Sequence, residues 1–262
     1  MEHSEGLYGR EQAAAFANDM LSYAMTIGEQ LLRSGAEISR VEDTIERICR
    51  TYGAERVEVL AITSSIIVTI YAKSYGSVTQ TRRIHGSAYN LTKLEHLNQL
   101  SRDICDEPPA LCVIEERLAA IDQTPQYDFK AMLGIYALIS GSFALLFGGT
   151  WQDAVASAII GVGLKPLQNL LSRINANAFL SAVICSIFGG IFAALSVRIG
   201  FAQNTDLIAI GNIMLLIPGV ALTNSIRDMF SGDTISGLLR FTEALLLAVT
   251  IAFGFALSAR WF

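Results

Sequence analysis

Apolar residues follow one another in long runs through the carboxyl-terminal half of the chain. A helix needs roughly 20 such residues to cross the hydrocarbon core of a membrane. Three runs reach this length almost without interruption, at residues 131–149, 176–197 and 241–259. Two further runs, at 151–171 and 207–226, have the length but carry polar residues. The pattern predicts an α-helical polytopic membrane protein, with five spans in a transmembrane domain of residues 126–262.

The amino-terminal half changes between helical and strand periods, which predicts a separate α+β domain over residues 1–125. Ser39 and Glu42 have the spacing of a capping box at the start of the second helix, and Gly53 is suited to end it. The predicted elements are helices at 13–32 and 39–52, strands at 57–60, 66–72 and 78–84, and helices at 89–100 and 111–121.

Charge is distributed unequally between the two halves. Of the charged residues, 11 follow Lys130, and the amino-terminal half holds 32. Basic residues favour the cytoplasmic side of a membrane. The positions of Lys130, Arg173, Arg227 and Arg240 therefore predict a cytoplasmic amino-terminal domain. After five spans the carboxyl terminus, with Arg260, is then expected outside.

Several function classes find no support in the sequence. The net charge of -5 and the lack of a basic stripe argue against nucleic-acid binding. The cysteines and histidines lack the spacing of metal ligands, so we expect neither a metal nor another cofactor. No nucleophile elbow or phosphate-binding loop is present, which argues against an enzyme, including a membrane-bound hydrolase.

The run at 151–171 carries the first candidate site. Its uninterrupted part is too short to cross a bilayer, which predicts a re-entrant or broken segment. Lys165, Pro166 and Asn169 lie together near its end. Lys165 can face a cavity and neutralise a substrate carboxylate, or extend to the cytoplasmic headgroups.

The run at 207–226 carries the second candidate site. Pro218 and Gly219 predict a kink or an interruption of the helix. The freed carbonyls, with the amides of Asn212 and Asn224, can bind a zwitterion or a coupling ion, although a structural kink alone also explains them.

Charged residues after this run allow two interpretations. Arg227 and Asp228 can form an ion pair in a loop, with Asp233 as the cap of the last helix. Alternatively, Asp228 or Glu243 carries a proton during transport. Asp153 is expected at the start of a helix.

Small residues also repeat at intervals of four, as in Ser140, Ala144 and Gly148, which predicts close helix packing within the chain or against a second subunit. In the amino-terminal half, Glu37, Arg40 and Glu42 cluster after Gly35. Helix capping and surface pairing explain most of this charged cluster.

Two segments together resemble the threonine/serine exporter family, and within it the larger subunit of the split, YjjP-like form. The first segment runs from Gly28 through Gly35 and Glu37 to Glu42. The second runs from Pro218 to Gly237 and includes the sequence Thr-Asn-Ser-Ile-Arg-Asp at 223–228.

This resemblance implies a multi-pass protein of the bacterial inner membrane that exports small hydrophilic metabolites, driven by the proton gradient. It also implies a small polytopic partner subunit of the same family. For the substrate, the resemblance implies L-threonine or L-serine, or alternatively succinate. A zwitterion needs one cation, such as Lys165, whereas a dicarboxylate needs a second, such as Arg173 or Arg227. A membrane-anchored regulatory subunit is an alternative function that also fits the sequence. Assembly into a higher oligomer is compatible with either function.

Overall fold

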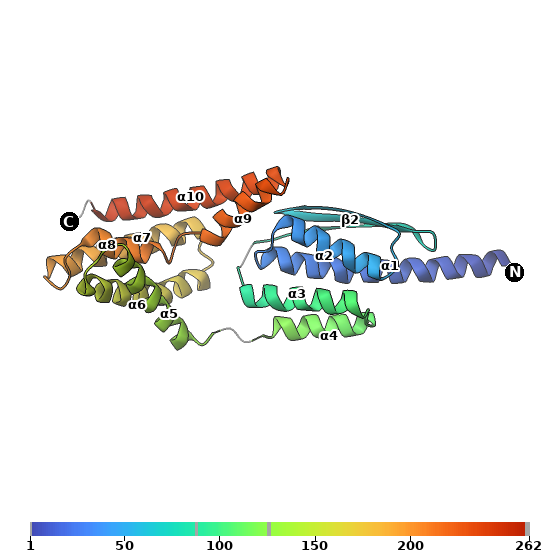
Figure 1. Ribbon diagram of the computed structural model, residues 1–262, viewed down its shortest axis with the longest axis horizontal. Helices are drawn as coiled ribbons and strands as arrows, with labels where there is room; N and C mark the ends of the chain where they lie inside the picture. Colours follow the sequence, from blue (N-terminus) through green and yellow to red (C-terminus); the bar gives the residue numbers. More distant parts are fainter. Residues whose placement is uncertain (1, 87–88, 125–126, 260–262) are drawn as a thin grey trace. The chain divides into compact units, whose positions relative to one another are not determined.

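The computed structural model describes residues 2–86, 89–124 and 127–259, and its elements divide into two compact units (Figure 1). The amino-terminal unit comprises residues 1–125 and 220–241. The second, here called the membrane unit, comprises residues 126–219 and 242–262. The predicted domain boundary at residues 125 and 126 lies outside the described residues, as does Arg260. The segment 220–241, which the sequence placed in the transmembrane domain, is grouped with the amino-terminal unit.

The amino-terminal unit contains a three-stranded antiparallel sheet in the order β1-β2-β3. Its strands are the three that the sequence pattern predicted. Helices form the rest of this unit. Its elements are α1 (Glu2–Arg33), α2 (Ile38–Thr51), β1 (Arg56–Ile62), β2 (Ser65–Ala72), β3 (Gly76–Arg83), α3 (Leu91–Asp106), α4 (Leu111–Asp122), α9 (Gly219–Phe230) and the first turns of α10 (Thr234–Ala259).

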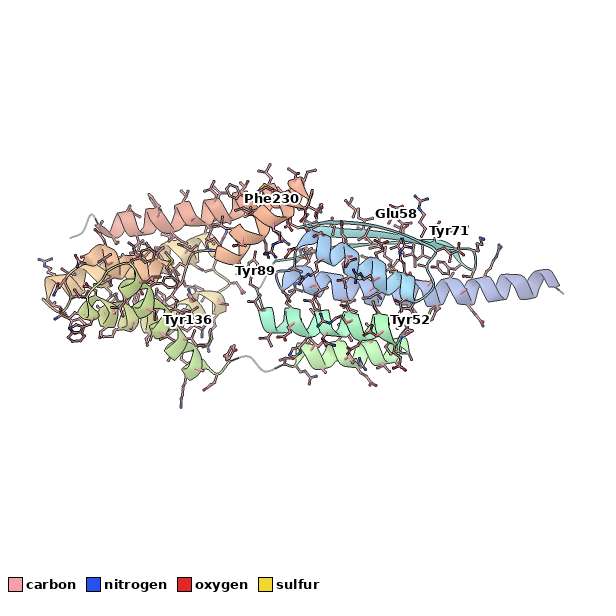
Figure 2. All side chains as sticks on the ribbon, viewed as in Figure 1. Tyr52, Glu58, Tyr71, Tyr89, Tyr136 and Phe230 are labelled. Carbon is pink, nitrogen blue, oxygen red and sulfur yellow. The ribbon has the colours of Figure 1, made fainter. Side chains whose placement is uncertain are left out.

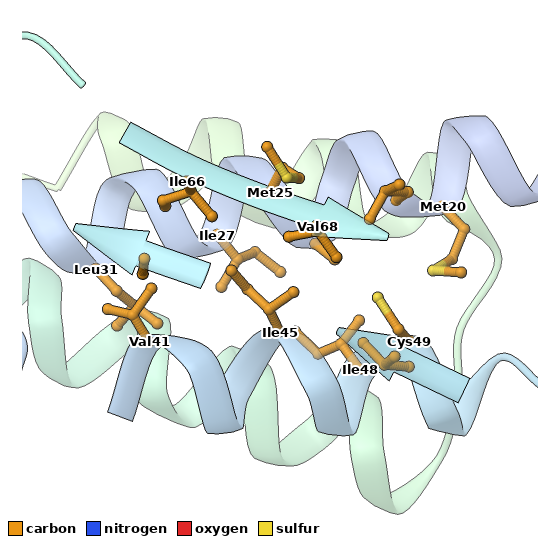
Figure 3. Close-up of a cluster of buried hydrophobic side chains, with 14 of the residues drawn as sticks. Met20, Met25, Ile27, Leu31, Val41, Ile45, Ile48, Cys49, Ile66 and Val68 are labelled. Atoms are coloured by element: carbon orange, nitrogen blue, oxygen red, sulfur yellow. The ribbon is translucent and has the colours of Figure 1, made fainter. Parts of the chain in front are cut away.

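One hydrophobic core holds this unit together. Alternate residues of β2, such as Ile66 and Val68, are fully buried because strand side chains point to opposite faces in turn. They pack against Ile27 of α1 and Ile45 of α2 (Figure 3). The helices α1 and α2 approach closely at Gly28, where a Cβ atom would lie 2.5 Å from Cδ1 of Ile45.

The capping box predicted at Ser39 is wrong. Helix α2 begins at Ile38, and its N-cap, Glu37, makes no side-chain cap. Glu42 Oε1 instead accepts a hydrogen bond from the backbone N–H of Ala61 at 2.7 Å. The carboxylate therefore ties α2 to β1 and is not free to reach back along its own helix.

The membrane unit is helical in its described part. Within the described residues of the chain, four helices are long and apolar enough to cross a membrane: α5 (Phe129–Leu146), α6 (Trp151–Arg173), α7 (Ala178–Arg198) and α10. Asp153 starts α6 in a reciprocal capping box with Thr150, as a helix-start residue should.

Two predictions about the spans are corrected. The run at 207–226 is not one continuous helix: it forms α8 (Thr205–Ile213) and α9, separated by turns at residues 214–218. With nine residues, α8 is about 14 Å long and cannot cross a core of about 30 Å. The run at 151–171 is not broken, because α6 continues as a helix through Pro166.

Candidate functional site

The two segments that carry the family resemblance meet inside the amino-terminal unit. Asp228 of α9 is fully buried, and its Oδ1 accepts a hydrogen bond from the backbone N–H of Ile38 at 3.1 Å. Its Oδ2 accepts from Nη1 of Arg240 at 3.0 Å. The same guanidinium donates to the carbonyl oxygen of Ala36 at 3.1 and 3.2 Å. One buried ion pair thus binds α9 and α10 to the loop between α1 and α2.

Two further contacts extend this junction. Asn224 Nδ2 donates to the carbonyl oxygen of Gly35 at 2.7 Å. Arg227 Nη1 pairs with the carboxylate of Glu37. Gly35 has a φ of 102°, a left-handed conformation that glycine adopts without strain. The loop can therefore turn and present its carbonyl groups to α9 and α10.

The predicted ion pair between Arg227 and Asp228 is wrong. Adjacent residues on a helix point to different sides, so Arg227 reaches Glu37 while Asp228 reaches Arg240. Arg40 of the predicted charged cluster is exposed on α2. Arg240 entered the sequence analysis only as a topology signal, because its partner Ala36 lies 204 residues away in the chain and its partner Asp228 lies on a different helix.

Burial raises the pKa of two carboxyl groups at or near the junction. Burial raises the pKa of Glu42, and the nearby charge of Asp233 raises it further, while the Ala61 N–H lowers it. Burial likewise raises the pKa of Asp228, against the opposing effects of Arg240 and the Ile38 N–H.

The raised pKa of Glu42 predicts that this carboxyl group stabilises the amino-terminal unit less as the pH rises. A carboxyl group with a raised pKa binds more protons in the folded state than in the unfolded state. Its stabilising effect is complete below the unfolded pKa and is lost as the pH rises through the folded pKa. Glu42→Gln keeps an oxygen for Ala61 N–H but cannot titrate, so melting temperatures measured against pH should fall less steeply in this variant. An unchanged slope would contradict the assignment to Glu42.

A buried polar cluster occupies the membrane unit, where α5, α6 and α8 meet. It consists of Ser140, Ser157 and Asn212, which are all fully buried. Ser140 Oγ lies 2.7 Å from Ser157 Oγ and 2.8 Å from Asn212 Oδ1. Asn212 Nδ2 donates to Ser157 Oγ at 3.2 Å. The cluster, here called the serine–asparagine cluster, joins three helices just before the interruption at residues 214–218.

The predicted site residue Lys165 lies on α6, partly buried. Its Nζ is 5.3 Å from the ring centre of Tyr136 on α5, a cation–π distance. The hydroxyl of Tyr136, a residue labelled in Figure 2, donates to Oε1 of Gln168 at 2.6 Å and restrains the ring. Tyr136 packs against the same apolar cluster as Leu215 and Leu216 of the interrupted segment. Lys165 is therefore held within the bundle by an aromatic ring.

The other predicted residues fall into separate groups. Pro218 and Gly219 end the interruption and begin α9, as the prediction of a kink or an interruption allows. Pro166 and Asn169 lie on α6, and Glu243 is exposed on α10. No group of histidine, cysteine or acidic residues in the described part of the chain could hold a metal ion. Sequence reasoning missed Tyr136 and Ser157, because nothing in their local sequence distinguishes them, and it noted Gln168 as a polar residue of its run without placing it in the site.

Comparison with known proteins decides the family. The model of the threonine/serine exporter family, ThrE, matches residues 22–261. The chain belongs to the threonine/serine exporter family. The family match begins within α1 and includes both segments that meet at the junction.

Relatives in this family differ in length. The chain is 26% identical to the "Probable succinate transporter subunit YjjP" of Escherichia coli (strain K12), over 86% of the chain and 87% of that protein. It is 27% identical to YjjP of Klebsiella aerogenes over 86% of each protein. It is 25% identical to the threonine/serine exporter of Corynebacterium glutamicum over 91% of the chain but only 50% of that protein. No solved structure matches the chain.

Proposed function

We propose that this threonine/serine exporter family member is the larger subunit of a split secondary transporter. It exports L-threonine and L-serine from the cytoplasm, driven by the proton gradient, together with a small polytopic partner of the same family. The protein lies in the bacterial inner membrane, with its amino-terminal unit in the cytoplasm and its carboxyl terminus outside. The match to about half of the Corynebacterium exporter, and to most of YjjP, which is named a subunit, supports a split transporter.

The observation that carries this proposal is the position of Lys165. Its ammonium group lies over the Tyr136 ring inside a bundle that also contains an interrupted helix. A charged side chain inside a membrane helix bundle is energetically costly, so such residues are rare and usually functional. Transporters also use interrupted helices to expose backbone groups to the substrate. Lys165 receives the carboxylate of the substrate, and Tyr136 with Gln168 holds the cation in place. Backbone carbonyl groups of the interrupted segment at residues 214–218 receive the substrate ammonium group.

Substrate chemistry favours a zwitterion over a dicarboxylate. Lys165 is the only lysine after Lys130. Arg173, a possible second cation, is exposed at the end of α6, and Arg227 is paired with Glu37. One cation suits one carboxylate. Export of succinate is the second candidate, because the YjjP relatives are named succinate transporter subunits.

Two charged groups remain as proton carriers in this proposal. Asp228 is already paired with Arg240, so its protonation must also weaken the junction. Glu243 is exposed on α10 and can exchange a proton without breaking an ion pair of this kind. We therefore assign proton transfer to Glu243.

Removing the Lys165 charge should lower export about 10- to 100-fold, which corresponds to the loss of one hydrogen bond to a charged group. Lys165→Ala and Lys165→Arg are compared in an efflux assay with preloaded labelled threonine. The arginine variant keeps the charge and should retain more export. Membrane abundance should stay unchanged, because the lysine side chain is only partly buried.

Lys130→Ala is the matched control, since Lys130 is an exposed lysine at the start of α5. Pro218→Ala should also lower export, because it restores a backbone donor in the interrupted segment. Normal export by both Lys165→Ala and Pro218→Ala would remove the proposed site. Full export by the partner alone would instead favour the regulatory-subunit interpretation.

A further inference from the structure

The serine–asparagine cluster holds more oxygen atoms than its protons can serve. Ser140 Oγ lies within 2.8 Å of three oxygens: the carbonyl oxygen of Ser157, Ser157 Oγ and Asn212 Oδ1. A hydroxyl group carries one proton and can donate only one ordinary hydrogen bond.

Ser157 does not remove this deficit. Its Oγ lies 3.1 Å from the carbonyl oxygen of Ser140 and 3.3 Å from the carbonyl oxygen of Ile208, in addition to its contact with Ser140 Oγ. Its single proton serves one of these three oxygens. The Asn212 amide protons go to Ser157 Oγ and to the Ile208 carbonyl. Suppose that Ser157 donates to Ser140 Oγ. The Ser140 proton then serves either the carbonyl oxygen of Ser157 or Asn212 Oδ1, and the other oxygen stays 2.8 Å from Ser140 Oγ with no proton between the two atoms.

The electrostatic setting of these oxygens favours a cation. Asn212 lies in the last turn of α8, where the helix dipole places partial negative charge. The cluster is fully buried inside the membrane unit, so water does not screen that charge. Interrupted membrane helices bind small monovalent cations in this way, with carbonyl groups and helix carboxyl-terminal ends as ligands.

We propose that Ser140, Ser157 and Asn212, with the carbonyl oxygens of Ser140 and Ile208, form a binding site for Na⁺. All these ligands are neutral oxygens, which suit a monovalent ion, whereas Mg²⁺ and Ca²⁺ recruit carboxylates. The ion is bound by the two oxygen atoms that have no proton between them, and it links the end of α8 to α5 and α6. This inference rests on the proposed transport function, because it adds an ion that binds next to the interrupted helix. Na⁺ binding can nevertheless be measured without a transport assay.

Thermal unfolding of the purified full-length chain tests the site directly. Sodium chloride should raise the melting temperature by about 3–6 °C over choline chloride of equal ionic strength, as expected at about tenfold saturation. Ser140→Ala removes the central oxygen and should abolish this shift. Ser186→Ala is the matched control: Ser186 is also a fully buried membrane-unit serine, and its hydroxyl has no partner in the described structure. It should keep the full shift.

A second variant keeps the test decisive if Ser140→Ala does not fold. Asn212→Asp places a carboxylate beside the Ile208 carbonyl oxygen, a repulsion that a cation relieves. Its melting temperature should depend on Na⁺ more strongly than that of the wild type. A wild type without a Na⁺-specific shift, an equal shift in Ser140→Ala, or an unchanged shift in Asn212→Asp would each overturn the site.

Efflux separates this inference from the proposed function. Uncoupler-sensitive export of threonine by a chain that shows no Na⁺ shift overturns the cation site and supports the transporter. A Na⁺ shift that Ser140→Ala abolishes, in a protein that exports none of the tested substrates, supports the site and overturns the export proposal.

Discussion

Replacing Asp228 with alanine is expected to destabilise the amino-terminal unit by about 3–5 kcal/mol, the usual cost of breaking a buried ion pair from one side. The substitution leaves the Arg240 guanidinium buried with only the Ala36 carbonyl oxygen of its present partners, and it removes the acceptor of the Ile38 N–H. Thermal or denaturant unfolding of the purified chain measures the effect. The loss should be accompanied by faster proteolysis of the loop between α1 and α2.

Asp103→Ala provides the control. Asp103 pairs with Arg117 on the surface of the same unit, with both side chains substantially exposed. Breaking that pair should cost no more than about 1 kcal/mol. Combining Asp228→Ala with Arg240→Met should recover part of the loss, because no unpaired charge then remains buried. Equal effects of Asp228→Ala and Asp103→Ala would show that the junction contributes nothing beyond a surface ion pair.

Gly211→Ala is expected to displace α8 from α5 and α6 and to abolish transport. A Cβ atom at Gly211 would lie 2.5 Å from the carbonyl oxygen of Ser140 and in still closer contact with Ser157 Oγ. Backbone cannot retreat as a flexible side chain can, so the helix itself must move. Overpacking of this kind costs about 1–3 kcal/mol and sometimes more. Unfolding and efflux should both be measured.

Gly134→Ala is the matched variant for this test. Gly134 lies in α5, and a Cβ atom there would meet nothing within 4 Å. Alanine should therefore be neutral or stabilise the helix by up to about 1 kcal/mol. If Gly211→Ala kept normal stability and export, the close approach of α8 to the serine–asparagine cluster would have no role.

Periodicity predicted most of the secondary structure because helices and strands with one buried face leave a local signature. The strands predicted at 66–72 and 78–84 agree with β2 and β3 to within two residues at each end. The capping box failed because a local motif cannot show that Ala61 competes for Glu42. The run at 207–226 was correctly expected to be interrupted near Pro218, but its apolar content does not show that α8 already ends at Ile213.

The candidate sites divide according to whether the signal is local. Lys165 and Asn212 were chosen as candidates because a polar side chain stands out in an apolar run. Tyr136 and Ser157 were not found, because their importance depends on which helix packs beside them. Pairing at the junction was equally hidden, since the partners of Asp228 come from α1–α2 and from α10.

The junction explains why the two resembling segments matter together. One supplies the backbone groups of Gly35, Ala36 and Ile38, and the other supplies the side chains of Asn224 and Asp228. Neither segment can satisfy its buried polar groups alone. The resemblance therefore marks a contact that builds the amino-terminal unit, whereas the proposed substrate site depends on Lys165 in the membrane unit.

The most direct test of the split-exporter account is efflux of preloaded labelled threonine, serine and succinate from cells that express this chain with and without its candidate partner. An uncoupler control tests the dependence on the proton gradient. The account predicts uncoupler-sensitive efflux of threonine and serine only when both chains are present. Efflux of succinate alone would replace the proposed substrate, and no efflux of any of the three from a stable membrane complex would contradict the account.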